Sequence, residues 1–148
     1  MNKNRKIFVN PRFARKGEYK KVIQSIVADG KCPFCPENFK YHKNPIIKKT
    51  KNWFITKSSW PYKNTKYHFL IIGKKHKEKF KDLTLKDFKE IKNLAGWTIK
   101  KFKITNGGLT LRFGDTNHTG STVNHLHFHL IIPKLKSRKS LPVNFPIG

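Results

Sequence analysis

The stretch Asn124–Pro133, NHLHFHLIIP, places three histidines at alternate positions with hydrophobic residues between them. On a β-strand, alternate residues project from the same face, so His125, His127 and His129 would form a column. The residues between them would point into the core from the opposite face. This pattern predicts a strand over residues 125–132 and sets its register, because a one-residue slip would bury all three imidazoles.

Three interpretations of this histidine column are open from the pattern alone. Neutral imidazole is a common zinc ligand, and alternate histidines on a strand can build a three-histidine metal site. One imidazole could instead attack phosphorus while its neighbours orient it and bind the phosphate. The third interpretation is an exposed stripe without function. Only seven histidines occur in 148 residues, so three within five positions argue for a function.

The residues just before the column favour the phosphate interpretation. Gly120, Ser121 and Thr122 offer hydroxyl groups and a flexible backbone, which suit hydrogen bonds to phosphate oxygens. The alternative is that these residues only form the turn that enters the strand.

A second motif, CPFC, places Cys32 and Cys35 at a spacing typical of a zinc knuckle. Two thiolates fill only half of a tetrahedral site, so two further ligands are needed. Histidines are the available donors: first His76, His68 and the three of the column, then His42 and His118. Without such partners, the two cysteines would be free thiols, since they lie too close together for a comfortable disulfide.

Hydrophobic periodicity and turn signals predict the remaining elements. A short helix is expected over residues 18–28, ended by Gly30, and a long helix begins at residues 82–84 with a capping box of Thr84 and Asp87. The predicted inward stripe of the long helix consists of Leu85, Phe88, Ile91, Ala95, Thr98 and Phe102. Strands are expected at Trp53–Thr56, Tyr67–Ile72 and Leu109–Phe113, and a polar loop at Gly114–Gly120.

These elements predict an α+β fold on an antiparallel sheet. Residues 1–16 form a basic N-terminal arm with little periodicity, and residues 17–148 are predicted to form a single domain. No apolar run is long enough to cross a bilayer, and the first ten residues lack the apolar segment of a signal peptide. We therefore expect a cytoplasmic protein that does not enter a membrane.

Positive charge dominates the composition. The chain has 33 Lys and Arg residues against 8 Asp and Glu, a formal net charge of +25. Such a surface attracts polyanions, so nucleic acid is a possible partner and anionic substrates are favoured. The alternative is that the lysines serve solubility, since they are spread along the chain and mark no particular site.

Taken together, the motifs resemble those of the histidine triad (HIT) family. His125–Ile131 resembles its signature of three histidines separated by hydrophobic residues, and Tyr67–His76 resembles a segment with two histidines eight residues apart. The CxxC motif is similar to one near the start of many members. The loop Ser58–Tyr62 resembles the nucleotide-facing segment of the nucleotidyl transferase and dinucleoside polyphosphate phosphorylase branches. These motifs span Cys32–Pro133, about two thirds of the chain.

The resemblance implies a HIT-like fold with one long and one short helix, often as a homodimer. It also implies a nucleotidyl hydrolase or transferase that cleaves a nucleoside phosphoanhydride or phosphoramidate, such as a dinucleoside polyphosphate. His127 would be the nucleophile that forms a nucleotidyl-histidine intermediate, and His129 would contact the reacting phosphate. By the same resemblance, a structural zinc ion would be bound by Cys32, Cys35, His76 and His125.

Substrate-binding roles follow from the resemblance with two departures. Many relatives have a glutamine where this chain has Ser121, next to Thr122, and Ser58 stands where an asparagine is common. His68 corresponds to a nucleotide-pocket histidine, although a strand-end histidine without that role is the alternative. Arg112, in the RFGD segment with Asp115, would face either the phosphate or solvent.

Two other functions remain open from the sequence. One is a HIT-type deadenylase that removes adenylate from the 5′ end of nucleic acid, which the positive charge favours. The other is a non-catalytic nucleotide-binding module, against which the retained His127 argues, since a binding protein needs no nucleophile.

Overall fold

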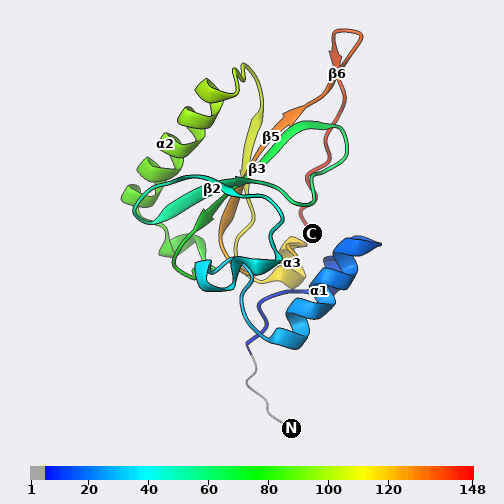
Figure 1. Ribbon diagram of the computed structural model, residues 1–148, viewed down its shortest axis with the longest axis vertical. Helices are drawn as coiled ribbons and strands as arrows, with labels where there is room; N and C mark the ends of the chain where they lie inside the picture. The colour runs from blue at the N-terminus through cyan, green and yellow to red at the C-terminus, as the bar shows by residue number, and fades with distance from the viewer. Residues whose placement is uncertain (1–5) are drawn as a thin grey trace.

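The computed structural model describes residues 6–148, and a five-stranded antiparallel sheet forms its centre (Figure 1). The strand order is β1-β2-β3-β5-β4. The strands are β1 (Ile46–Lys49), β2 (Trp53–Lys57), β3 (Thr65–Gly73), β4 (Gly108–Leu111) and β5 (His127–Pro133). A small separate hairpin joins β6 (Leu135–Lys136) to β7 (Lys139–Ser140). The predicted α+β class is confirmed.

Three α-helices accompany the sheet: α1 (Glu18–Asp29), α2 (Leu85–Lys101) and α3 (Thr116–Thr119). Short 3-10 turns lie at Pro11–Phe13, Pro36–Tyr41 and Phe80–Asp82. As predicted, α1 ends at Gly30, which adopts a φ of +67° that glycine tolerates better than other residues. The prediction of a loop over Gly114–Gly120 was wrong in its centre, where α3 forms. The Asp115 carboxylate caps it by accepting the Asn117 N–H at 2.9 Å.

Helix α2 packs on one face of the sheet and begins at the predicted capping box. The middle of the predicted stripe is confirmed at Ile91, Ala95 and Thr98, which are buried. Its start was wrong, because Leu85 is 89% exposed and Phe88 is 38% exposed. The carboxylates of Asp87 and Glu90 are buried instead, and Asp87 accepts a 2.8 Å hydrogen bond from the indole N–H of Trp53. Polar residues with internal partners took positions that hydrophobic periodicity assigns to apolar ones.

The two faces of β5 have different neighbours. Its apolar face contributes Phe128 and Leu130 to the core under α2, as predicted, together with Ile132, and the predicted Leu126 joins this core from just before the strand. The strand begins at His127, two residues later than expected, so His125 precedes it. All three histidines are buried, which excludes the interpretation of an exposed stripe. Phe34 packs against His127 at 4.9 Å between ring centroids, and residues of α1 line the same cavity as His127.

The predicted basic arm over residues 1–16 is partly described. Residues 1–5 lie outside the described part of the chain, while Val9 is buried and forms a β-bridge with Val123. The Asn10 N–H donates to the Thr122 carbonyl at 2.7 Å, so the arm contacts the segment that leads into the triad. None of the helices in residues 6–148 has the length and hydrophobicity to span a bilayer.

Candidate functional site

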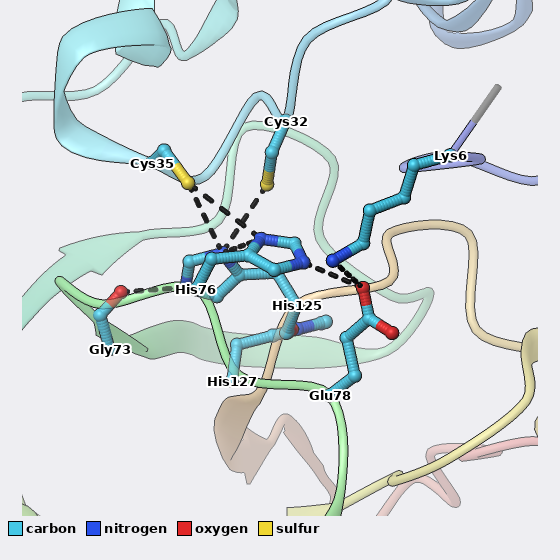
Figure 2. A network of polar contacts seen from close by, with 8 residues as sticks. All are labelled: Lys6, Cys32, Cys35, Gly73, His76, Glu78, His125 and His127. Atoms are coloured by element: carbon cyan, nitrogen blue, oxygen red, sulfur yellow. Dashed lines mark hydrogen bonds and ion pairs between the residues drawn. The ribbon is translucent and has the colours of Figure 1, made fainter. Parts of the chain in front are cut away.

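Two cysteines and two histidines from distant parts of the chain meet at one point (Figure 2). His125 Nδ1 lies 3.3 Å from Cys32 Sγ, 3.8 Å from Cys35 Sγ and 3.2 Å from His76 Nδ1. Cys35 Sγ lies 3.7 Å from His76 Nδ1, and all four ligand atoms lie within 4.8 Å of one another. Ligand atoms around a tetrahedral zinc ion are separated by about 3.3–3.8 Å, from bond lengths of about 2.0–2.3 Å. The four predicted metal ligands therefore form a cluster of the size that zinc requires.

The outer nitrogens of both histidines have acceptors that suit metal binding. His125 Nε2 lies 2.6 Å from the Gly73 carbonyl, and His76 Nε2 lies 2.7 Å from the Glu78 carboxylate. These acceptors hold the ring protons on Nε2 and leave both Nδ1 lone pairs facing the cluster, the usual arrangement around protein-bound zinc. Burial raises the pKa of the Cys32 thiol to about 12, and a bound cation would deprotonate it. The donor set fits a closed structural zinc site.

His127 stands next to this cluster but faces a cavity. Its Nδ1–H donates to the His125 carbonyl at 2.6 Å, which leaves Nε2 with a free lone pair. Burial lowers the pKa of His127 to about 4, so the ring is neutral at physiological pH. A neutral, oriented imidazole in a buried cavity has the properties of a nucleophile.

A hydrogen-bonded chain fixes the protons of two further histidines. The Tyr62 N–H donates to His68 Nδ1 at 3.1 Å, so a neutral His68 carries its proton on Nε2. That proton is donated to His129 Nδ1 at 2.8 Å, which places the His129 proton on Nε2. Among the residues that the structure describes, His129 Nε2 is buried and has no partner. This series of hydrogen bonds therefore presents the His129 N–H as a donor beside His127. The ring centroids of His127 and His129 lie 4.8 Å apart.

The cavity is lined by both apolar and cationic side chains. Ile23 and Ile26 of α1 and Phe34 of the knuckle contribute apolar surface. Arg112 contributes positive charge, and its guanidinium donates to the Tyr62 hydroxyl at 2.8 Å. Such a lining suits a ligand that carries both a flat apolar group and a phosphate chain.

The structure brings together all the predicted substrate-binding residues, since Ser58, His68, Arg112, Ser121 and Thr122 all line this cavity. Two of the hydroxyls have internal acceptors. Ser121 Oγ donates to the Val123 carbonyl at 3.0 Å and Thr122 Oγ1 donates to the Phe13 carbonyl at 3.3 Å. The hydroxyl hydrogens of Ser121 and Thr122 are therefore engaged within the protein.

Sequence analysis missed the residues that the two ends of the chain bring to the cavity. Arg15 and Tyr19 line it from the N-terminal side. From the C-terminal side, the Pro146 carbonyl accepts a 2.7 Å hydrogen bond from Arg112 Nε, and the Phe145 ring lies 4.1 Å from the same guanidinium. No sequence signal predicts such contacts, because they depend on segments that are distant in the sequence meeting in space, such as Arg112 and Pro146, which are 34 residues apart.

The buried His68–His129 pair predicts acid sensitivity. Burial, with Arg15, His127 and Arg112 nearby, lowers the pKa of His68 to about 3, and burial also lowers the pKa of His129. A histidine in the unfolded chain has a pKa of about 6.5. Below that pH the unfolded state therefore takes up protons that the folded state does not. The free energy of unfolding should therefore fall as the pH drops from about 6.5 toward 3, by about 2 kcal/mol at pH 5 from His68 alone, with a further loss from His129.

Urea unfolding at pH 7 and pH 5 measures this effect in the wild type and in His68→Gln. The variant should lose less stability than the wild type over this interval, since one titrating group is gone. Equal losses in both proteins would contradict the assignment.

The family model named HIT domain matches residues 43–136, more than half of the chain. A search of curated proteins found no match.

Solved structures of low sequence identity share the fold. A histidine triad nucleotide-binding protein from Candida albicans is 24% identical with a TM-score of 0.59, over 80% of this chain and 85% of that one. A HIT family hydrolase from Legionella pneumophila is 23% identical with a TM-score of 0.53, over 74% and 95%. A zinc-bound histidine triad family protein from Mycobacterium smegmatis is 17% identical with a TM-score of 0.56, over 80% and 83%.

Proposed function

This chain belongs to the HIT family, and we propose that it is a nucleotidyl hydrolase or transferase that cleaves a nucleoside phosphoanhydride or phosphoramidate, such as a dinucleoside polyphosphate. One observation carries the proposal. His127 is neutral and buried, is oriented by its bond to the His125 carbonyl, and faces a cavity lined by both apolar and cationic side chains. These features suit attack on phosphorus by an imidazole nitrogen.

In the proposed reaction, His127 Nε2 attacks the α-phosphorus and forms a phosphorus–nitrogen bond. The bond from phosphorus to the leaving group breaks, and the leaving group departs with the electron pair. Water, or another acceptor, then attacks the same phosphorus, and the phosphorus–nitrogen bond breaks to restore the imidazole. Throughout, the Nδ1–H of His127 stays on the His125 carbonyl, which stabilises the positive charge that the ring carries in the intermediate.

Two neighbouring groups stabilise the phosphate in this scheme. His129 Nε2–H, which has no hydrogen-bond partner within residues 6–148, donates to a phosphate oxygen. Arg112, which also lines the cavity, adds positive charge. The tautomer of His129 depends on His68 and on the Tyr62 N–H, so His68 acts as a positioning residue.

Zinc, bound by Cys32, Cys35, His76 and His125, would have a structural role in this proposal. A site with four protein ligands offers no position for water or substrate. The His125 carbonyl orients the nucleophile, so these ligands also support the position of His127.

Trapping of the covalent intermediate tests the proposed function. We expect that brief incubation with diadenosine tetraphosphate, followed by rapid denaturation at alkaline pH, leaves one adenylate on the protein. Peptide mass spectrometry should place it on the peptide that contains His127. Turnover without such an adduct, or an adduct on another residue, would contradict the mechanism.

The homodimer, the cytoplasmic location and the division into arm and domain stay predictions. Strand β4 is at one edge of the sheet, and its Leu109 side chain is exposed. A cluster of further exposed apolar side chains consists of Phe80, Phe88 and Phe113. These side chains support pairing of two copies of the chain. Light scattering measures the molar mass of the protein in solution and so distinguishes a monomer from a homodimer.

A further inference from the structure

The side chain of Tyr62 lines the same cavity as His127, and the surrounding groups fix its position. Its ring is stacked on the ring of His129 at 5.7 Å between centroids, with an angle of 11° between the planes, and lies against His68 at 4.7 Å. The backbone is anchored as well, since the Tyr62 N–H donates to His68 Nδ1 at 3.1 Å and the Tyr62 carbonyl accepts from Thr65 Oγ1 at 2.8 Å. The phenol group is therefore held in place beside the triad histidines.

The Tyr62 hydroxyl accepts a hydrogen bond and keeps its own hydrogen free. The Arg112 guanidinium donates to the hydroxyl oxygen at 2.8 Å, and within residues 6–148 no group accepts the hydroxyl hydrogen. Tyr62 and Arg112 both line the cavity, so this hydrogen is available to a ligand bound there. A cation that donates to the phenol oxygen also stabilises the phenolate that remains when the proton leaves. These are the properties of a proton donor for a reaction in the cavity.

Along β5, Tyr62 and His127 lie on opposite sides of His129. His127 starts β5, whereas the loop that carries Tyr62 leads into β3 at Thr65, which pairs with Pro133 at the far end of β5. Among the described residues, the Tyr62 ring contacts the ring of His129 but not that of His127. Attacking and leaving atoms lie roughly in line on opposite sides of a reacting phosphorus. With His127 as the nucleophile and a phosphate oxygen on His129, the leaving atom would therefore point toward Tyr62.

We propose that Tyr62 is the general acid that protonates the leaving group, an inference that rests on the proposed function of His127 as the nucleophile. As the bond from phosphorus to the leaving group breaks, the leaving atom takes the electron pair of that bond and the proton of the Tyr62 hydroxyl. The electron pair of the O–H bond stays on the phenolate oxygen, which Arg112 stabilises. In the second step, the attacking water gives a proton to the phenolate while the phosphorus–nitrogen bond breaks, so both side chains are restored.

The need for an acid depends on the leaving group, which gives the proposal a sharp test. An alkylamine leaves phosphorus slowly unless it receives a proton, whereas 4-nitrophenolate leaves as a stable anion. Two substrates with the same adenylate group therefore report on the proton: adenosine 5′-phosphoramidate with an alkylamine as the leaving group, and adenosine 5′-(4-nitrophenyl) phosphate. A residue that only positions the phosphate would affect both substrates alike.

Tyr62→Phe removes the hydroxyl and keeps the ring on His129 and the backbone N–H on His68. With the amine substrate, kcat/KM of this variant should fall roughly 10²-fold or more, as expected for the loss of a general acid. With the nitrophenyl substrate, kcat/KM should change little. Thermal melting of the variant checks that the fold is kept.

Tyr67→Phe is the matched control. Tyr67 is also half-buried, and its ring packs on Phe69 and Phe102 outside the cavity, so loss of its hydroxyl should leave both rates unchanged. The proposal is overturned if Tyr62→Phe loses rate equally with both substrates, since the hydroxyl would then only bind or position them. It is also overturned if neither rate falls, or if the wild type releases nitrophenolate but not the amine.

Trapping of the adenylate during turnover of the nitrophenyl substrate separates this inference from the proposed function. We expect an adduct on His127 in both the wild type and Tyr62→Phe, because formation of the adduct from this substrate needs no acid. An adduct in both proteins together with equal rates on the amine substrate would refute the role of Tyr62 alone. Turnover by the wild type without an adduct would refute the nucleophile, and the role of Tyr62 with it.

Discussion

Replacing His127 with alanine is expected to abolish turnover, lowering kcat by roughly 10⁴-fold or more, because no other group replaces a covalent nucleophile. The fold should persist. The polar contact of the His127 side chain is its hydrogen bond to the His125 carbonyl, and loss of such a bond costs about 1 kcal/mol. Steady-state release of AMP from diadenosine tetraphosphate measures the rate, and circular dichroism with thermal melting checks the fold.

His118→Ala is the matched control for this substitution. The His118 side chain is 85% exposed and lies outside the cavity, so its loss should leave kcat unchanged. Hydrolysis by folded His127→Ala at the wild-type rate would disprove the assignment of the nucleophile. If the variant still binds AMP, the lost activity reflects chemistry and not a collapsed site.

Replacing Cys32 with serine is expected to remove the metal and lower the melting temperature by about 10 °C. A closed structural zinc site stabilises the folded state through its binding free energy, here taken as about 3 kcal/mol, which in a domain of this size corresponds to about that shift. Activity should fall as well, because the His125 carbonyl that orients His127 belongs to one of the proposed metal ligands. Mass spectrometry of the purified protein measures metal content.

Glu37→Gln is the control for the cysteine variant. Glu37 is exposed, lies two residues beyond Cys35, and does not belong to the cluster, so this variant should keep the metal and the melting temperature. Full metal content in Cys32→Ser would support the alternative of a zinc ion held by the three triad histidines. The observed geometry disfavours that alternative, since His125 points toward the cysteines and His129 toward His68.

Local features of the fold could be predicted from the sequence because their causes lie within a few residues. The capping box at Thr84 and Asp87 marks the start of α2, and Gly30 marks the end of α1. The alternation in β5 determined which side chains enter the core under α2. Where polar residues have internal partners, as at Asp87, the same periodicity failed, since it counts hydrophobicity and not hydrogen bonds.

By itself, the sequence determined the α+β class and the family resemblance, which implies a different role for each of the three histidines. Only the tertiary structure decided that His125 turns away from the column into a cluster with Cys32, because β5 begins at His127. It also decided the protons of His129, which depend on the Tyr62 N–H acting through His68. The physical reason is distance along the chain: the Cys32–His125 and His68–His129 contacts join residues 93 and 61 positions apart. Spacing in a sequence does not encode such meetings, which arise only when strands and loops pack together.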